Sequence, residues 1–324
     1  MTTTSSRPGI DVAGQARLLC EAVESVIQGK PQEVRLVVTC LLAEGHLLLE
    51  DVPGTGKTTL ARALASAVAV ESTRIQFTPD LLPSDVTGVS IYSQATGEFV
   101  FRPGPVLSNI VLADEINRAS PKTQSALLEV MEEGTVSVEG RQLPVPRPFM
   151  VVATQNPVDM EGTYVLPEAQ LDRFLMRLSL GYPEPAAEAQ MLRAQKHGPT
   201  VAHLAPVLTG LDVGAMIETV KQVEVAPAAE DYIVAVCAAT RVMPEVRLGV
   251  SPRGSLALLR AARALAAVQG RTHLLPDDVK AVAGPVLTHR ILLRPEAELA
   301  GFTSADAVRR ALSDVPVPRT AVGV

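Results

Sequence analysis

The stretch 50-EDVPGTGKTTLARAL-64 decides the fold of this chain. Its Gly56-Lys57-Thr58 matches the end of the phosphate-binding pattern G-x-x-x-x-G-K-[ST], but Asp51 stands where that pattern has its first glycine. An apolar run precedes the loop and a helical pattern follows it. A fragment such as G-x-G-K-T also arises by chance in glycine-containing loops. The order of strand, loop and helix therefore favours a phosphate loop.

A phosphate loop works because successive backbone N–H groups point at the ligand from the start of a helix. Lys57 would supply positive charge to the outer phosphates, and the Thr58 hydroxyl would ligate Mg²⁺. Asp51 lies at the entry of the loop, and Asp is among the residues that tolerate a positive φ there. We therefore expect a working site for ATP and Mg²⁺, formed by Gly54, Thr55, Gly56, Lys57, Thr58 and Thr59.

An acidic pair follows the loop at the end of the apolar run 109-NIVLADE-115. Phosphoryl transfer requires an acid that holds Mg²⁺ and a second group that orients the attacking water. We expect Asp114 to face the metal and Glu115 to face the water, since the longer side chain reaches further into the site. The alternative is two surface acids that end a strand, but five apolar residues before them indicate a buried strand.

The strand 149-FMVVATQN-156 ends in three polar residues. Ligands of open α/β sheets lie outside the carboxyl ends of the strands. A neutral amide at that edge can position water or contact the terminal phosphate without repelling it, and Asn156 is the residue we expect to do so. The alternative is an Asn that merely begins a turn before Pro157.

The order of the remaining patterns predicts the architecture. Apolar runs that do not alternate, separated by helices, indicate a parallel sheet covered on both faces. The sequence predicts two β-hairpins, at 88–106 and 135–146, a helix that begins after Ser120 and ends at Gly134, and further strands at 74–77 and 176–180. After a boundary near 181–185 the pattern becomes helical, with one helix capped by Ser251 and carrying Leu256, Leu259 and Ala262 along one side. We expect a disordered tail at 1–15, an α/β domain at 16–182 and an all-helical domain at 183–324.

Composition narrows the class of protein. The chain has 324 residues, 47% of them hydrophobic, and a formal net charge of −6, which argues against binding to nucleic acid. Cys20, Cys40 and Cys237 have neither metal-ligand spacing nor an even count, so we interpret them as reduced core residues. The sequence shows no signal peptide and no apolar run long enough to span a membrane, and we expect a cytoplasmic protein.

Four segments together resemble the MoxR family of AAA+ ATPases: LLLEDVPGTGKTTLARALA, VLADEINRASPKTQSALLEVMEE, VVATQNPVDMEGTYVLPEAQLDRFLMRL and LGVSPRGSLALLRAARALA. The resemblance runs from about residue 13 to 294. It implies an α/β P-loop NTPase core with a central parallel sheet and two β-hairpin insertions, followed by a helical lid. It also implies an assembly, usually a hexamer, that holds ATP between subunits.

The resemblance assigns roles residue by residue. Lys57 and Thr58 match the Walker A pair, Asp114 and Glu115 match the Walker B pair, and Asn156 matches sensor 1. Arg173 in LDRF matches the arginine finger that reaches the ATP of a neighbour, and Arg253 in SPRG matches sensor 2. The stretch 26-VIQGKPQEV-34 resembles the segment that packs on adenine, which implies contacts from Ile27 and Gly29.

Without the resemblance, both arginines have simpler interpretations. Arg173 could be a structural residue paired with Asp172, and Arg253 could be a solvated group at the start of a helix. The helix dipole disfavours a cation at that end, so a phosphate bound near Arg253 would remove the conflict. The patterns assign no role to Arg118, Lys122, His289 or Arg290.

The function that the resemblance implies is an ATP-driven chaperone that matures or activates partner complexes. Its partners often carry a von Willebrand factor A domain, and metal-cofactor insertion is a recurring theme. The alternatives are the motor subunit of a metal chelatase, a nucleic-acid motor, and a nucleotide-gated scaffold with slow turnover. The net negative charge and the 3% aromatic content count against the nucleic-acid motor.

Overall fold

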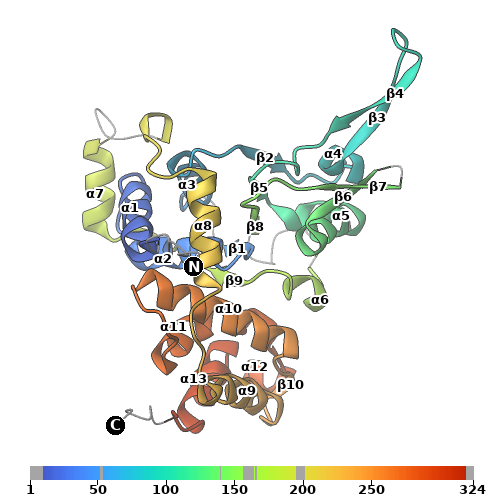
Figure 1. Cartoon of the computed structure of the whole chain (residues 1–324). Helices are drawn as coiled ribbons and strands as arrows, with labels where there is room; N and C mark the ends of the chain where they lie inside the picture. The colour runs from blue at the N-terminus through green and yellow to red at the C-terminus, as the bar shows by residue number, and fades with distance from the viewer. Residues whose placement is uncertain are drawn as a thin grey trace, which may run out of the picture.

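The computed structural model describes residues 10–51, 54–138, 140–155, 164, 166–194 and 201–318. They form a nucleotide domain above a helical lid in the view of Figure 1. The nucleotide domain is built on a five-stranded parallel sheet with the order β2-β5-β8-β1-β9. Its strands are β1 Leu47–Glu50, β2 Ser72–Gln76, β5 Ile110–Asp114, β8 Met150–Gln155 and β9 Met176–Leu178. All five were predicted, with ends that differ by one or two residues.

The sheet is apolar on both faces because successive side chains of a strand point to opposite sides. In β1, Leu47 and Leu49 join one buried cluster and Leu48 joins the other. The first cluster includes the inner faces of α1 Val12–Glu24, α2 Pro31–Leu42 and α3 Lys57–Ala67. The second includes residues of α4 Pro83–Thr87, the 3₁₀ turn η1 Ile116–Arg118 and α5 Pro121–Glu133. The short helix α6 Glu168–Leu171 packs at its edge.

Capping residues near each helix end determine where α5 and α10 begin, at the positions that the sequence predicted. Ser120 caps α5, since its hydroxyl accepts from Thr123 N, and Gly134 ends the helix at φ 64°. Ser251 caps α10 in the same way. At the N-terminus, the Asp11 side chain accepts from Gly14 N, so α1 begins at Val12. Residues 12–15, expected to belong to a disordered tail, are therefore helical.

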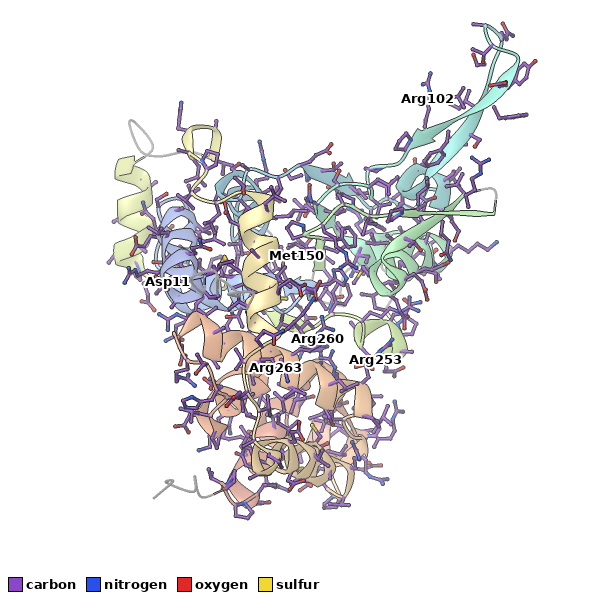
Figure 2. All side chains as sticks on the ribbon, viewed as in Figure 1. Asp11, Arg102, Met150, Arg253, Arg260 and Arg263 are labelled. Carbon is purple, nitrogen blue, oxygen red and sulfur yellow. The ribbon has the colours of Figure 1, made fainter. Side chains whose placement is uncertain are left out.

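Both predicted hairpins are present. The strands β3 Gly88–Ser93 and β4 Glu98–Pro103 pair antiparallel, and Figure 1 shows this hairpin projecting away from the body of the molecule. The second hairpin, β6 Thr135–Val138 and β7 Arg141–Pro144, follows α5 directly. Arg102 on β4 is labelled in Figure 2, far from the lid.

The lid is helical, with one small antiparallel pair of strands that the sequence did not predict. Its elements are α9 Pro227–Arg241, β10 Val246–Leu248, α10 Pro252–Val268, α11 Pro276–Leu287, η3 Thr288–Arg290, β11 Leu292–Leu293, α12 Pro295–Leu299 and α13 Ser304–Asp314. In α10 the buried face includes Leu258, Ala261 and Leu265, whereas Leu256 is 63% exposed. The expected apolar side of this helix was therefore wrong at Leu256.

The segment between β9 and α9 packs on the nucleotide domain, although it was expected in the lid. It contains α7 Pro185–Ala194, η2 Val201–His203 and α8 Gly210–Val220. The N–H groups of Val207 and Leu208 donate to Ala67 O at the end of α3, at 2.9 and 3.1 Å. The apolar face of α8 belongs to the same buried cluster as α1 and α2. A helical pattern shows which face is apolar but not which neighbour covers it.

The three cysteines are free. Cys40 and Cys237 are buried, and Cys20 is half-buried. Cys40 and Cys237 are therefore core residues, as interpreted, and Cys20 packs against the core from its margin. None of the described helices is long and apolar enough to cross a membrane.

Candidate active site

The phosphate loop places an uncapped helix end at the carboxyl edge of the sheet. α3 begins at Lys57 with Gly56 as its N-cap, and no side chain caps its first N–H groups. Gly54 and Gly56 both have φ 90°, a conformation that favours glycine. A Cβ on Gly54 would meet no atom within 4 Å. Open space beside Gly54 and the positive end of a helix fit the phosphates of a nucleotide.

Lys57 is held at this edge by the backbone of the loop entry. Its ammonium donates to Asp51 O at 2.6 Å, and the residue is only 9% exposed. Burial lowers the pKa of Lys57, while the nearby carboxylates of Asp51, Asp114 and Glu115 act to raise it. The cation therefore lies where the loop and the acidic strand end come together.

Asp51 has a structural role that the sequence did not predict. Its carboxylate is buried and accepts from Leu180 N at 2.6 Å and from Gly181 N at 2.8 Å. Its own φ is not positive, so the expected reason for tolerating Asp here was wrong. The carboxylate instead ties the loop entry to the chain that leaves β9. Asp51 at the first position of the pattern is therefore an anchor for the loop entry.

Asp114 ends the buried strand β5 and lies beside the loop. The Thr58 hydroxyl donates to its Oδ2 at 3.4 Å, and the Thr154 hydroxyl donates to its Oδ1 at 3.1 Å. Arg74 on the neighbouring strand β2 forms an ion pair with Oδ2 at 2.7 Å. The structure therefore brings together the hydroxyl and the carboxylate that were predicted to ligate Mg²⁺. These are the hard oxygen ligands that this cation prefers.

Glu115 has a strained backbone conformation. Its φ of 55° and ψ of 49° lie in the left-handed region, which costs a non-glycine residue about 1–2 kcal/mol. Its N–H donates to Thr154 Oγ1 at 3.0 Å. Its carboxylate accepts from Gln76 Nε2 at 2.9 Å and from Arg118 at 3.2 Å. Backbone strain of this kind concentrates at functional sites, where surrounding bonds maintain it.

Thr154 is the most informative residue that the sequence analysis missed. It is the buried polar residue near the end of β8 that contacts both Asp114 and Glu115. Its polar side chain within an apolar strand was a usable signal, although Asn156 was the residue expected to act there. Asn156 lies outside the described residues. Gln155, between the two, donates to Glu50 Oε1 at 2.9 Å.

The stretch expected near adenine lies against the loop. Ile27 is buried, and its Cδ1 would lie 4.0 Å from a Cβ on Gly56. Gly29 has φ 75°, and a Cβ there would lie 2.8 Å from Ala187 Cβ of α7. Glycine is therefore required at this position by its backbone and by the close approach of α7. Thr59 lies one residue further along α3 than Thr58 and is half-buried.

Arg173 and Arg253 come together, at the opposite edge of the sheet from the loop. Arg173 forms an ion pair with Glu132 Oε2 at 2.9 Å, and Arg253 binds the other oxygen of the same carboxylate. Figure 2 shows Arg253 at the junction of the lid and the nucleotide domain. Because Met176 of β9 pairs in parallel with Leu47 of β1, Arg173 precedes the amino end of the sheet.

The loop, by contrast, follows the carboxyl end of β1. The strand runs from Leu47 to Glu50, so at about 3.3 Å per residue its two ends are roughly 10 Å apart. The structure thus joins the two predicted arginines to each other and separates both from the loop of their own subunit.

Arg173 does not pair with Asp172, so the simpler interpretation named the wrong partner. Asp172 pairs with Arg290, at 2.7 Å, whereas Arg173 pairs with Glu132. Arg253 has 46% of its side chain exposed, yet it is ion-paired and not merely solvated. Glu132 is a second residue that the sequence analysis missed.

Comparison with known proteins agrees with this geometry. Residues 46–176 match the model of the ATPase family associated with various cellular activities (AAA), and residues 238–311 match the AAA lid domain. Chaperone MoxR1 of Mycobacterium tuberculosis is 43% identical over 92% of this chain and 81% of its own length. The chain belongs to the MoxR family of AAA+ ATPases.

Two further relatives extend this result. The uncharacterized protein YeaC of Bacillus subtilis is 51% identical over 93% of this chain and 95% of its own length. A crystal structure of a protein from Cytophaga hutchinsonii superposes with a TM-score of 0.89 at 36% identity, over 95% of this chain and 96% of that one. The MoxR-family resemblance and the core-plus-lid fold are therefore confirmed, and the chain is an ATPase.

Membership of the family implies nucleotide binding. AAA+ proteins generally act as oligomers. Among the described residues, no group of three or more His, Cys, Asp or Glu is placed to hold a metal ion. Mg²⁺ at this site would accordingly take most of its ligands from phosphates and water, as it usually does in such enzymes.

Proposed function

We propose that this MoxR-family ATPase is a chaperone that works as a ring, closes each ATP site with a neighbouring subunit, and uses turnover to remodel or activate partner complexes. The observation that supports it most directly is the separation of the two halves of the site. The loop and the acids lie at the carboxyl edge of the sheet, and both arginines lie at the amino edge. An isolated subunit therefore has an incomplete site.

Within the proposed ring, each side chain has a separate task. The N–H groups at the start of α3 and the Lys57 ammonium bind the phosphates of ATP. Thr58 and Asp114 hold Mg²⁺, which when bound neutralises charge on the transferred phosphoryl group. Glu115 orients the attacking water and accepts its proton, from a position fixed by Gln76 and Thr154.

The neighbouring subunit supplies the positive charge on the other side of the phosphate. Arg173 and Arg253 share one carboxylate, so they are already close enough to converge on a single anion. Their ligand in the ring would be the terminal phosphate of the neighbour's ATP. We propose a hexamer, because that is the usual assembly of the family that the sequence resembles.

The choice of a chaperone rests on the relatives. The related protein of M. tuberculosis is named a chaperone. We propose a partner that carries a von Willebrand factor A domain, with metal-cofactor insertion as one of the processes served. The projecting hairpin β3–β4 is available for such contacts, since Tyr92 and Phe99 on it are 54% and 67% exposed. A chelatase motor and a slow nucleotide-gated scaffold are the competing functions.

Mixing two inactive variants tests the shared site. Arg173→Ala should bind ATP and lose most turnover, since a trans arginine contributes roughly 10³–10⁵ in rate in GTPases. Lys57→Ala should lose most of its ATP affinity. A mixed ring pairs an intact loop with an intact neighbouring arginine, so the mixture should regain activity. Mixed assemblies confirmed by native mass spectrometry that hydrolyse no more ATP than their components would refute the shared site.

Glu115→Gln tests the catalytic base and identifies the partner. Loss of the carboxylate should leave the phosphate loop intact and slow hydrolysis by roughly 10²–10⁴-fold. The variant should therefore hold ATP and retain its partner. Pulldown with and without ATP then separates a chaperone client, a chelatase subunit and a scaffold ligand. Wild-type turnover in this variant would assign the base to another residue.

A further inference from the structure

The lid contributes a buried cation to the chain segment that carries Arg173. Arg290 lies in η3, and its side chain is only 3% exposed. Its Nε donates to Asp172 Oδ1 at 2.7 Å, and the guanidinium also donates to Asp172 O at 3.1 Å, Phe174 O at 2.7 Å and Leu175 O at 3.3 Å. It further donates to Val286 O in the last turn of α11, the helix that precedes η3. The residues on either side of Arg173 are therefore both fixed by one side chain of the lid.

The same cluster reaches the helix that carries Arg253. The second oxygen of Asp172 accepts from the hydroxyl of Ser251 at 3.3 Å, and Ser251 is the N-cap of α10. Gly254, in the first turn of that helix, lies against Arg290, since a Cβ there would be 3.1 Å from Arg290 Cδ. The same Cβ would overlap Val250 Cγ1, so the first turn of α10 has no room for a side chain here between Val250 and Arg290.

Two carboxylates thus link the two arginines into one unit. Glu132 pairs with the guanidinium groups of both Arg173 and Arg253. Asp172, next to Arg173, pairs with Arg290 and accepts from Ser251, the N-cap of the helix that carries Arg253. Stability alone is a weak reason for such a cluster, because a well-packed apolar group often stabilises a buried position as well as an ion pair does. A planar guanidinium, in contrast, fixes several acceptors in a defined geometry.

We propose that Arg290 is a positioning residue for catalysis: it locks the segment 172–175 to the lid, so that Arg173 and Arg253 reach the neighbour's ATP together. This inference rests on the shared site of the proposed function. Arg290 does not touch the nucleotide. It acts on the subunit that supplies the arginines, and not on the subunit whose loop holds the ATP.

The variants that test it are Arg290→Met, which keeps an unbranched side chain and removes the donors, and Asp172→Asn, which keeps the shape of the side chain and removes its charge. Each should bind ATP with wild-type affinity by calorimetry. In the homogeneous ring, Arg290→Met should lower kcat by roughly 10²-fold, the size of effect that a small misplacement of catalytic groups produces, and change KM little. Asp172→Asn should lower kcat less. Arg310→Met, in a lid ion pair with Glu245, is the matched control and should keep wild-type turnover.

The turnover of mixed assemblies distinguishes a positioning role of Arg290 from a purely structural one. Arg290→Met mixed with Lys57→Ala should regain turnover, because the intact loop of one meets the intact arginines of the other. Arg290→Met mixed with Arg173→Ala should regain none, because both lack the same half-site. If Arg290→Met does not assemble, Asp172→Asn replaces it in the mixtures with Lys57→Ala and with Arg173→Ala.

Three results would overturn the inference. Wild-type kcat in both homogeneous variants would show that the cluster positions nothing. Failure of Lys57→Ala to restore Arg290→Met, in mixtures where it restores Arg173→Ala, would place the defect in the variant's own site. Failure to restore Arg173→Ala as well would reject the shared site of the proposed function, and the role of Arg290 with it.

Discussion

Replacing His46 by glutamine should make the stability of this protein less sensitive to acid. His46 lies just before β1 and is buried. Its Nδ1 accepts from Val151 N at 3.0 Å, which requires that nitrogen to be unprotonated. Its Nε2 lies 3.0 Å from Met131 O and carries the proton in this tautomer. The ring therefore connects β8 and α5 only in its neutral form.

The magnitude follows from the pKa of this ring. Burial lowers the pKa of His46 from 6.5 to about 4, and the charge of Arg260 acts in the same direction. Between these two values the unfolded chain binds a proton that the folded chain does not bind, so stability falls as the pH falls through this window. The contribution is complete above pH 6.5 and amounts to about 3 kcal/mol of unfolding free energy.

Denaturant unfolding at a series of pH values between 6.5 and 4 measures this effect. His46→Gln should show a shallower fall of unfolding free energy than the wild type, because glutamine offers a donor and an acceptor without a titration. His273→Gln, at an exposed position, is the matched control and should follow the wild type. The pKa of buried His289 is also lowered, but that residue is present in all three proteins. Equal slopes for His46→Gln and the wild type would refute the argument.

Two further substitutions test close contacts near the site. Asp51→Gly should retain ATP binding, since Lys57 donates to the backbone carbonyl of that position, but it leaves the N–H groups of Leu180 and Gly181 without their acceptor. Unfolding free energy should fall by about 1–3 kcal/mol per group, and an unchanged thermal midpoint would contradict this role. Gly254→Ala would normally stabilise a helix by about 1 kcal/mol, yet its Cβ would overlap Val250 Cγ1 and lie 3.1 Å from Arg290 Cδ. The overlap should destabilise α10 by about 1–3 kcal/mol, so a raised midpoint would disprove this close packing.

The parts of the fold that the sequence predicted are those controlled by neighbouring residues. A run of buried residues made β5 evident, and Ser120 and Gly134 set the ends of α5 through their own side chain and backbone. The phosphate loop was evident for the same reason, since its glycines, cation and helix are contiguous. Asp51 was the exception, because its two partners lie about 130 positions further along the chain.

The parts that the sequence did not predict depend on tertiary neighbours. The sequence offered Asp172 as the partner of Arg173, and only the fold shows that Arg173 pairs with Glu132 while Asp172 pairs with Arg290. The exposure of Leu256 has the same cause, since other positions of α10 face the rest of the lid. Helical periodicity locates an apolar face but cannot show which of two nearly apolar faces is covered.

Glu132 and Arg253 each lie at the helix end where the dipole disfavours their charge. Glu132 lies in the last turn of α5, which contains no basic residue, and Arg253 lies in the first turn of α10, which contains no acidic one. Each position is unfavourable by about 0.3–1 kcal/mol with respect to its own helix dipole, and the ion pair between them offsets both. A phosphate near Arg253 was expected from the sequence, and in this structure the carboxylate of Glu132 takes that place. Each guanidinium has five N–H donors, so a phosphate bound to a neighbouring subunit can compete with Glu132 for both arginines. The terminal phosphate of ATP carries more negative charge than a carboxylate, and this favours it in that competition.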